Sequence, residues 1–192
     1  MKTPQSLSQI MQKSEKYLPP EPVNFQIREN ARKIFSNLFK ELIPDFKYLP
    51  EYEQVTNWLE NNKGKGLALI GANGRGKTII GRLIIPVLFV INHQKHFTRV
   101  NAQEMNENLD DILRRRLITI DDIGVEDQRV VYGERRWAFP EVMDNAEKNR
   151  NIIVFTSNLD APAIEKKYGL RTRERVRAVC KVVVFKGESL RV

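Results

Sequence analysis

Residues 71–78 read GANGRGKT and combine three glycines with a lysine and a threonine. An apolar segment precedes residues 71–78 and another follows them, as expected of a phosphate-binding P-loop between a strand and a helix. Glycines lack a Cβ, so consecutive backbone N–H groups can curl around an anion, and the next helix N-terminus adds positive potential. We expect Lys77 to reach the β- and γ-phosphates of a nucleotide and the Thr78 hydroxyl to bind Mg²⁺.

A glycine-rich surface turn is the alternative interpretation of this loop. If the loop holds a nucleotide, contacts are expected from all of its residues, which are Gly71, Ala72, Asn73, Gly74, Arg75, Gly76, Lys77, Thr78 and Ile79.

Two adjacent carboxylates, Asp121 and Asp122, follow the segment LITI about forty residues after the loop. Like charges repel when they are buried together unless a cation lies between them, and Mg²⁺ would be that cation. Side chains alternate in direction along a strand, so one carboxylate can hold the metal while the other orients water. We assign Asp121 to Mg²⁺, together with Thr78, and Asp122 to the general base. Two exposed aspartates that open a turn are the alternative.

The segments around these motifs alternate between strand and helix. Helices are expected over 78–91, with a kink at Pro86, and over 102–115, with a capping box of Asn101 and Glu104. A third helix is expected with Pro140 in its first turn, and it buries Phe139, Val142, Met143 and Ala146. The expected strands are GLALIG, HFTRV, LITID, NIIVFTS and KVVVF. Repeated strand and helix units predict an α/β fold with a parallel sheet of about five strands and helices on both faces.

The first third of the chain is expected to be helical. A short helical segment is expected around residues 6–17. Residues 24–43 are expected to form an amphipathic helix with Asn24 as N-cap, and residues 51–61 a further helix. The apolar face of the helix over 24–43 is Ile27, Ala31, Ile34, Leu38 and Leu42, with Phe35 and Phe39 on its flank. This region could dock a partner or pack on the core, and we favour packing. The polar NKGKG turn divides the chain into a helical segment, 1–62, and a catalytic core, 63–192.

The composition of the chain restricts its possible binding partners and its cellular compartment. The net charge is +8, and the last 22 residues hold seven basic against two acidic groups, which suits a phosphate-rich partner or a solvated tail. A single cysteine, Cys180, excludes an internal disulfide and fits a reducing compartment. No secretory signal is evident, and the longest apolar stretch, 83–91, is too short to span a bilayer. These features predict a cytoplasmic protein without a membrane partner.

Four segments occur in an order that resembles the AAA+ ATPases of the DnaC helicase-loader and IstB transposition-helper group: GANGRGKT, LITIDDIG, VFTSNLD, and RTRERVR with VVVFKGESLR. The resemblance covers about residues 63–192. It implies an AAA+ P-loop fold, ATP and Mg²⁺ as ligands, ATP hydrolysis, and assembly with itself or on a replicative helicase or a transposase. Asn158 is similar to the sensor 1 residue, and Arg175 aligns with the arginine finger. Their alternatives are a helix N-cap for Asn158 and solvated basic surface for Arg175.

The chain also departs from this group. A single helix fills residues 102–115, where relatives carry an insertion that grips single-stranded DNA, so Arg114, Arg115 and Arg116 are the remaining candidates for DNA contact. No C-terminal helical lid is expected, and Arg75 has no explanation in the sequence. The expected function is a DnaC-like helicase loader in DNA replication. An IstB-like helper, a small-molecule kinase and a non-hydrolysing P-loop module are the alternatives.

Overall fold

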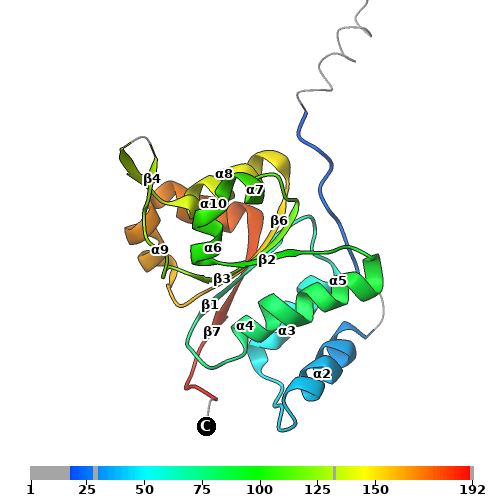
Figure 1. Ribbon diagram of the computed structural model, residues 1–192. Coiled ribbons are helices and arrows are strands. Elements are labelled where there is room, and N and C mark those ends of the chain that lie inside the picture. The colour runs from blue at the N-terminus through cyan, green and yellow to red at the C-terminus, as the bar shows by residue number, and fades with distance from the viewer. Residues whose placement is uncertain (1–17, 28–29, 132, 191–192) are drawn as a thin grey trace, which may run out of the picture.

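A five-stranded parallel sheet organises the chain. The structure, a computed structural model, describes residues 18–27, 30–131 and 133–190 (Figure 1). The strands lie in the order β2-β3-β6-β1-β7, and all of them are parallel. Their bounds are β1 Gly66–Gly71, β2 Thr98–Asn101, β3 Leu117–Ile123, β6 Ile152–Ser157 and β7 Cys180–Phe185. The predicted fold class is confirmed, because each expected strand forms and the P-loop strand β1 lies inside the sheet.

Helices cover both faces of the sheet, as predicted (Figure 1). Side chains of β1 alternate between two cores, since Leu67 and Leu69 belong to one cluster and Ala68 and Ile70 to the other. The first cluster packs under α2 Ala31–Leu42, α3 Pro50–Glu60, α4 Lys77–Ile79, the π-helical turn Ile80–Ile84 and α5 Ile85–His93. The second packs under α6 Ala102–Glu107, α7 Leu109–Ile112, α8 Ala138–Asn149, α9 Ala161–Tyr168 and α10 Leu170–Val179.

The helix expected over 24–43 is shorter than predicted and turns a different face inward. It begins at Ala31 after Asn30, which has a left-handed φ of 52°, so Asn24 is not its N-cap. Phe35 and Phe39 are buried while Leu42 is 48% exposed. Large aromatic side chains bury more apolar area than the aliphatic stripe does, and this decides the rotation of the helix.

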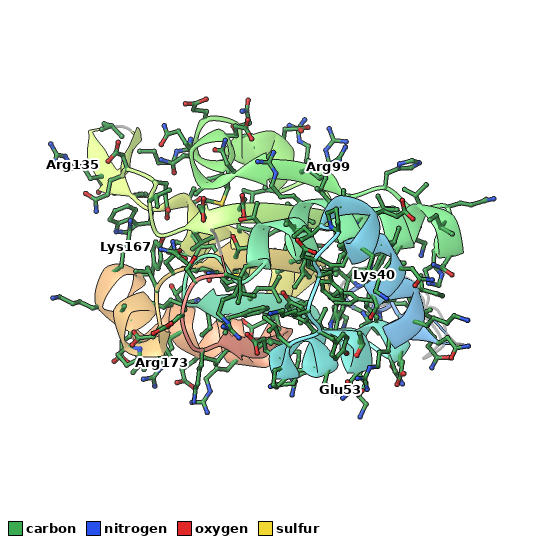
Figure 2. All side chains as sticks on the ribbon, turned by 90° about the horizontal axis from the view of Figure 1, so that it is seen from below. Lys40, Glu53, Arg99, Arg135, Lys167 and Arg173 are labelled. Atoms are coloured by element: carbon green, nitrogen blue, oxygen red, sulfur yellow. The ribbon has the colours of Figure 1, made fainter. Side chains whose placement is uncertain are left out.

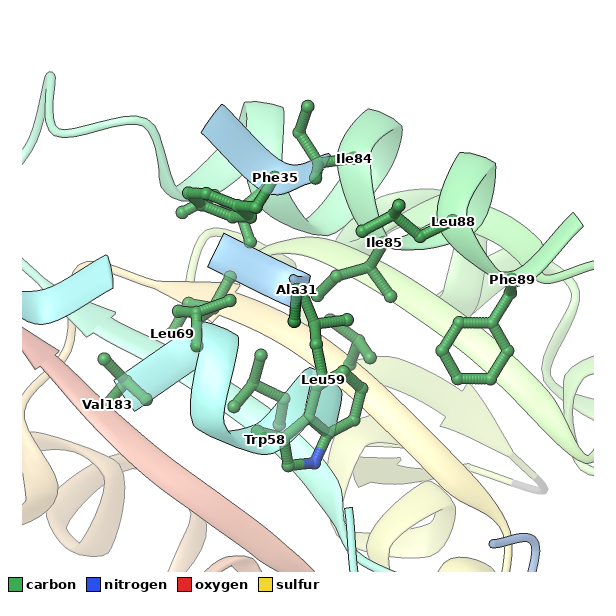
Figure 3. Close-up of a cluster of buried hydrophobic side chains, with 14 of the residues drawn as sticks. Ala31, Phe35, Trp58, Leu59, Leu69, Ile84, Ile85, Leu88, Phe89 and Val183 are labelled. Carbon is green, nitrogen blue, oxygen red and sulfur yellow. The ribbon is translucent and has the colours of Figure 1, made fainter. Parts of the chain in front are cut away.

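The helices α2 and α3 pack on the sheet and share its core. Figure 3 shows Phe35 of α2 and Leu59 of α3 beside Leu69 of β1 and Ile84 of the helix after the P-loop. The core therefore crosses the residue 62 boundary drawn from the sequence. The packing interpretation of α2 is confirmed for the described residues, and the short helical segment expected around residues 6–17 lies outside them.

Two other helices deviate locally from expectation. The helix after the P-loop contains the π-helical turn Ile80–Ile84 directly before Pro86. The capping box of Asn101 and Glu104 is present, but the expected helix over 102–115 is two short helices, α6 and α7. Asn108 lies between them with non-helical φ and ψ.

A small antiparallel hairpin was not predicted. It consists of β4 Arg129–Val131 and β5 Glu134–Arg136, and Arg135 projects from it at the edge of the molecule (Figure 2). Lys167 of α9 holds the base of the hairpin by donating to the Gly124 carbonyl at 2.6 Å. None of the helices in the described part of the chain combines the length and apolar character that crossing a bilayer requires.

Candidate nucleotide-binding site

The loop between β1 and α4 is built around glycines with left-handed backbone. Gly71, Gly74 and Gly76 have φ of 113°, 70° and 82°. A Cβ at Gly71 would lie 2.3 Å from the Phe185 carbonyl oxygen, and one at Gly74 would lie 2.0 Å from Ser189 Oγ. These glycines therefore permit both the curvature that an anion needs and the close approach of β7 and the C-terminal tail.

Lys77 is buried at the start of α4, beneath the loop. Its Nζ donates to the carbonyl oxygens of Gly71 at 2.8 Å and Ala72 at 2.7 Å, and to Asn158 Oδ1 at 3.0 Å. The ammonium group thus joins the P-loop to the end of β6. A phosphate oxygen would be a stronger acceptor than these neutral carbonyls, because both partners of that hydrogen bond are charged.

The two carboxylates at the end of β3 diverge, as predicted. Asp121 is buried, and its Oδ1 accepts from Thr156 Oγ1 at 2.6 Å. Asp122 is exposed, has a left-handed φ of 57°, and lines the cavity in front of the P-loop. The register between β3 and β6 shifts between Ile120 and Ile123. This irregularity turns Asp122 toward the cavity while Asp121 stays at the strand.

Thr156 on β6 positions both carboxylates, and the sequence reasoning did not single it out. Its hydroxyl donates to Asp121 and accepts from the Asp122 backbone N–H at 2.9 Å. Arg82 Nη1 also lies 3.9 Å from Asp121 Oδ2. The only available signal was the place of Thr156 in the VFTSN segment, two residues before Asn158.

We expect Thr156→Val to lower ATP turnover about tenfold or more and to leave ATP affinity within about threefold. The substitution keeps the volume but removes a hydroxyl that bonds a carboxylate, and such bonds contribute about 1.5–3 kcal/mol. Single-turnover hydrolysis and calorimetric ATP titration measure the two quantities. Thr156→Ser is the matched control, since it keeps the hydroxyl. Parental turnover in the valine variant would contradict a positioning role.

Asn158 faces the P-loop lysine rather than the next helix. The N-cap of α9 is Asp160, whose Oδ1 accepts from the Ala163 backbone N–H at 2.9 Å. The alternative role of Asn158 as a helix cap is therefore wrong. Its contact with Lys77 places its amide beside the phosphate-binding loop, and a sensor role stays a prediction.

A cavity of about 660 Å³ opens in front of the P-loop, a volume typical of small-molecule sites. One wall holds the loop with Asp122 and Asn158. The other wall comes from the end of α2, the α2–α3 connection, the start of α3 and the C-terminal tail. It consists of Phe39, Ile43, Asp45, Phe46, Lys47, Tyr52 and Leu190. Sequence reasoning did not find this second wall, because its residues lie far from the motif along the chain.

The second wall contains an aromatic stack. The rings of Phe39 and Tyr52 lie 5.3 Å apart at 19°, and those of Phe46 and Tyr52 lie 5.8 Å apart at 6°. Burial, reinforced by the charge of Glu51, raises the pKa of Tyr52 to about 12. The phenol therefore stays protonated at neutral pH and donates to the Arg75 carbonyl oxygen at 3.1 Å. Phe39 and Tyr52 are buried, so Phe46, Ile43 and Leu190 are the apolar side chains that this wall exposes to the cavity. An apolar surface backed by stacked rings suits a nucleobase.

Arg75, unexplained in the sequence, points into an ion pair. The residue is buried, and its Nε lies 2.6 Å from Oε1 of Glu51, which is buried as well. Its Nη1 donates to the Glu188 carbonyl oxygen at 3.1 Å. Contacts with α3 and with the tail thus account for a bulky cation inside the loop.

Arg175 lies on α10, outside the set of residues that line the cavity. Its side chain is 14% exposed and pairs with Asp144 and, at 2.9 Å, with Glu147 of α8. Arg171 lies on the same flank, 3.7 Å from Asp144, whereas Arg173 on the opposite flank pairs with Glu165 (Figure 2). An arginine finger at Arg175 remains a prediction, and it would have to exchange the α8 carboxylates for phosphate.

The three arginines after α7 are partly engaged within the molecule. Arg115 pairs with Asp111 at 2.9 Å, and Arg116 donates to the Glu21 carbonyl oxygen at 2.7 Å. Contact of this run with single-stranded DNA stays a prediction.

The residues present fit a nucleotide with Mg²⁺. The glycine loop leaves space that a Cβ would fill, Lys77 supplies a cation, and Thr78 lines the cavity. Within the residues that the structure describes, no three His, Cys, Asp or Glu side chains form a metal cluster. Mg²⁺ commonly binds through one or two protein groups together with phosphates and water. Thr78 lines the cavity and Asp121 does not, so their assignment as the two protein ligands stays a prediction.

Comparison with known proteins establishes the fold. No protein-family model and no curated protein sequence matches the chain. Among solved structures, the chain is similar to DnaI, with 22% identity over 84% of this chain and 88% of that chain and a TM-score of 0.52. The DnaC helicase loader is 14% identical over 90% of this chain and 95% of that chain, with a TM-score of 0.53.

AMPPCP-bound DnaA from Aquifex aeolicus is a further similar structure, with 18% identity, a TM-score of 0.50, and coverage of 74% of this chain and 49% of that chain. Identities this low carry information about fold alone. The chain thus has the α/β P-loop fold of AAA+ proteins, as its motifs indicate.

Proposed function

We propose that this chain is an ATP-hydrolysing AAA+ protein that loads a replicative helicase in DNA replication. The observation that carries the proposal is the convergence of Lys77, Asp122 and Asn158 on one cavity beside a glycine loop. The likeness to DnaI and to the DnaC helicase loader, each over more than four fifths of both chains, supports the choice of partner.

Binding is the first task of the site. The backbone N–H groups of residues 71–77 and the Lys77 ammonium group hold the phosphates, while the aromatic wall around Tyr52 holds the base. Thr78 and Asp121 would hold Mg²⁺, which when bound neutralises charge on the phosphates. In the absence of phosphate, Lys77 bonds the loop carbonyls, so binding exchanges these acceptors for charged oxygens.

Hydrolysis requires a positioned water molecule. Asp122 reaches the cavity from β3 and acts as the base, and Asn158 bridges the water and the terminal phosphate. Arg175 does not line the cavity of its own chain, so it can act only on a nucleotide held by another copy. Self-association is therefore part of the proposal, and hydrolysis depends on it.

An affinity purification tests the partner. The tagged chain, expressed in the cells that encode it and supplied with ATP, should recover a replicative helicase identified by mass spectrometry. Lys77→Ala is the matched control, because it keeps the surface of the protein while removing the cation for the phosphates. ATP turnover of the purified protein is measured in parallel.

Two results would overturn the proposal. Recovery of a transposase in place of a helicase would assign the chain to transposition, as an IstB-like helper. Binding of ATP without turnover, with or without the recovered partner and DNA, would make it a non-hydrolysing interaction module.

A further inference from the structure

Three segments that are distant in sequence meet behind the P-loop: helix α3, the loop itself and the tail after β7. Arg75 is in contact with both of the others. Its side chain pairs with Glu51 of α3 and bonds the Glu188 carbonyl of the tail, while its own carbonyl accepts from Tyr52. One residue of the loop is thus bound to α3 through its side chain and its main chain.

The tail lies directly on the loop. The Leu190 backbone N–H donates to the Gly74 carbonyl at 3.1 Å, and Leu190 lines the cavity. Gly187 has φ of 104°, and a Cβ there would lie 3.0 Å from Arg75 Nη1. A side chain at Gly187 would therefore push against Arg75.

Arg75 is bonded to the aromatic wall through Tyr52 and its neighbour Glu51. These contacts lie on the side of the wall, not on the phosphate side of the loop. Glu51 precedes Tyr52, and Tyr52 stacks on Phe39 and Phe46. A Cβ at Gly76 would lie 2.9 Å from the Tyr52 hydroxyl oxygen, so loop and wall are in close contact. If the Arg75 side chain is lost, the wall and the tail lose a group that bonds both of them, while the main-chain bonds of the loop to Tyr52 and Leu190 remain.

We propose that Arg75 is a positioning residue that fixes the base-binding wall against the phosphate loop, and that residues 187–190 form a strap that follows this wall. The inference rests on the proposed nucleotide site and deepens it. The affinity gained from the base and sugar depends on Arg75, whereas the affinity for the phosphates alone does not. Nucleotide binding also reduces the motion of residues 187–190, because Arg75 and Gly74 of the loop form hydrogen bonds with this strap.

The test compares ATP with inorganic tripolyphosphate, which offers phosphates without a base. Arg75→Met should weaken ATP binding about tenfold or more in calorimetric titration and leave tripolyphosphate binding within about threefold. Arg32→Met is the matched control, since it breaks an exposed ion pair with Glu53, which is also on α3, and should change neither affinity. Lys77→Ala should lose both ligands.

Folding is followed separately by thermal unfolding without ligand. Arg75→Met leaves the Glu51 carboxylate buried without its cation, so the double variant Arg75→Met/Glu51→Met provides a second measurement in which no buried charge is orphaned. It should fold and show the same selective loss of ATP affinity. Hydrogen exchange at residues 187–190 should be slowed by ATP in the parent and not in either variant.

The outcomes separate the two proposals. Equal weakening of ATP and tripolyphosphate would make Arg75 a determinant of the phosphate loop, and unchanged ATP affinity would leave it without a role in binding; either overturns the inference. A parent protein that binds neither ligand would overturn the proposed function itself.

Discussion

Lys77→Ala should leave a folded protein whose ATP affinity is lower by about a hundredfold or more. The Lys77 ammonium group is buried beside the loop, between two loop carbonyls and Asn158, and we expect it to contact the phosphates there. Removing a charged partner from a phosphate contact costs several charge-assisted hydrogen bonds, each about twice as strong as a neutral one. Calorimetric titration with ATP measures the loss.

Lys65→Ala is the control for this variant, because Lys65 lies at the opposite end of β1, before Gly66. It should bind ATP as the parent does. If Lys77→Ala and Lys65→Ala both bind ATP with the affinity of the parent, the loop is a glycine-rich turn and not a phosphate-binding site.

Asp122→Asn should bind ATP with the affinity of the parent, and its rate of ATP hydrolysis should be lower by about a hundredfold or more. Asparagine keeps the size of the side chain but cannot accept a proton, and loss of a group that orients or activates water has effects of this order. Single-turnover hydrolysis with saturating ATP measures the rate. Loss of binding equal to that of Lys77→Ala would contradict the role of base.

Mixing Asp122→Asn with Arg175→Ala extends this test to the oligomer. Each variant alone should be inactive, but at a mixed interface an intact Asp122 faces an intact Arg175 from the other chain, so activity should partly return. An arginine that acts within its own chain cannot give this result. A mixture that stays inactive while the chains co-assemble would leave Arg175 as a structural partner of Asp144 and Glu147.

The sheet and the phosphate loop could be predicted from the sequence because both depend on local pattern. Buried parallel strands are short apolar runs, and the P-loop spacing is specific when a strand precedes it and a helix follows. The helix after Trp137 was predicted with its buried face, Phe139, Val142, Met143 and Ala146, since its apolar residues recur at helical spacing.

The remaining features depend on contacts between distant residues. Arg75 bonds Glu51 and Glu188, which are 24 and 113 positions away along the chain. A local sequence pattern cannot predict partners at such separations. Of the apolar face predicted for the helix over 24–43, Ile27 and Ala31 are buried, but Leu42 is exposed and Phe35 and Phe39 of the flank are fully buried. Packing of Phe39 against Tyr52 and Phe46 favours burial of the aromatic flank. The β4–β5 hairpin was missed because strands of three residues are too short to show alternation.

The position of β1 inside the sheet has a consequence for how the protein is made. Both neighbours of this strand, β6 and β7, follow it by more than eighty residues, and the tail that bonds Gly74 comes later still. During synthesis the phosphate loop is made before either of the strands that pair with β1, so its place in the sheet is fixed only after β6 and β7 have been made. Pairings of this separation also slow folding.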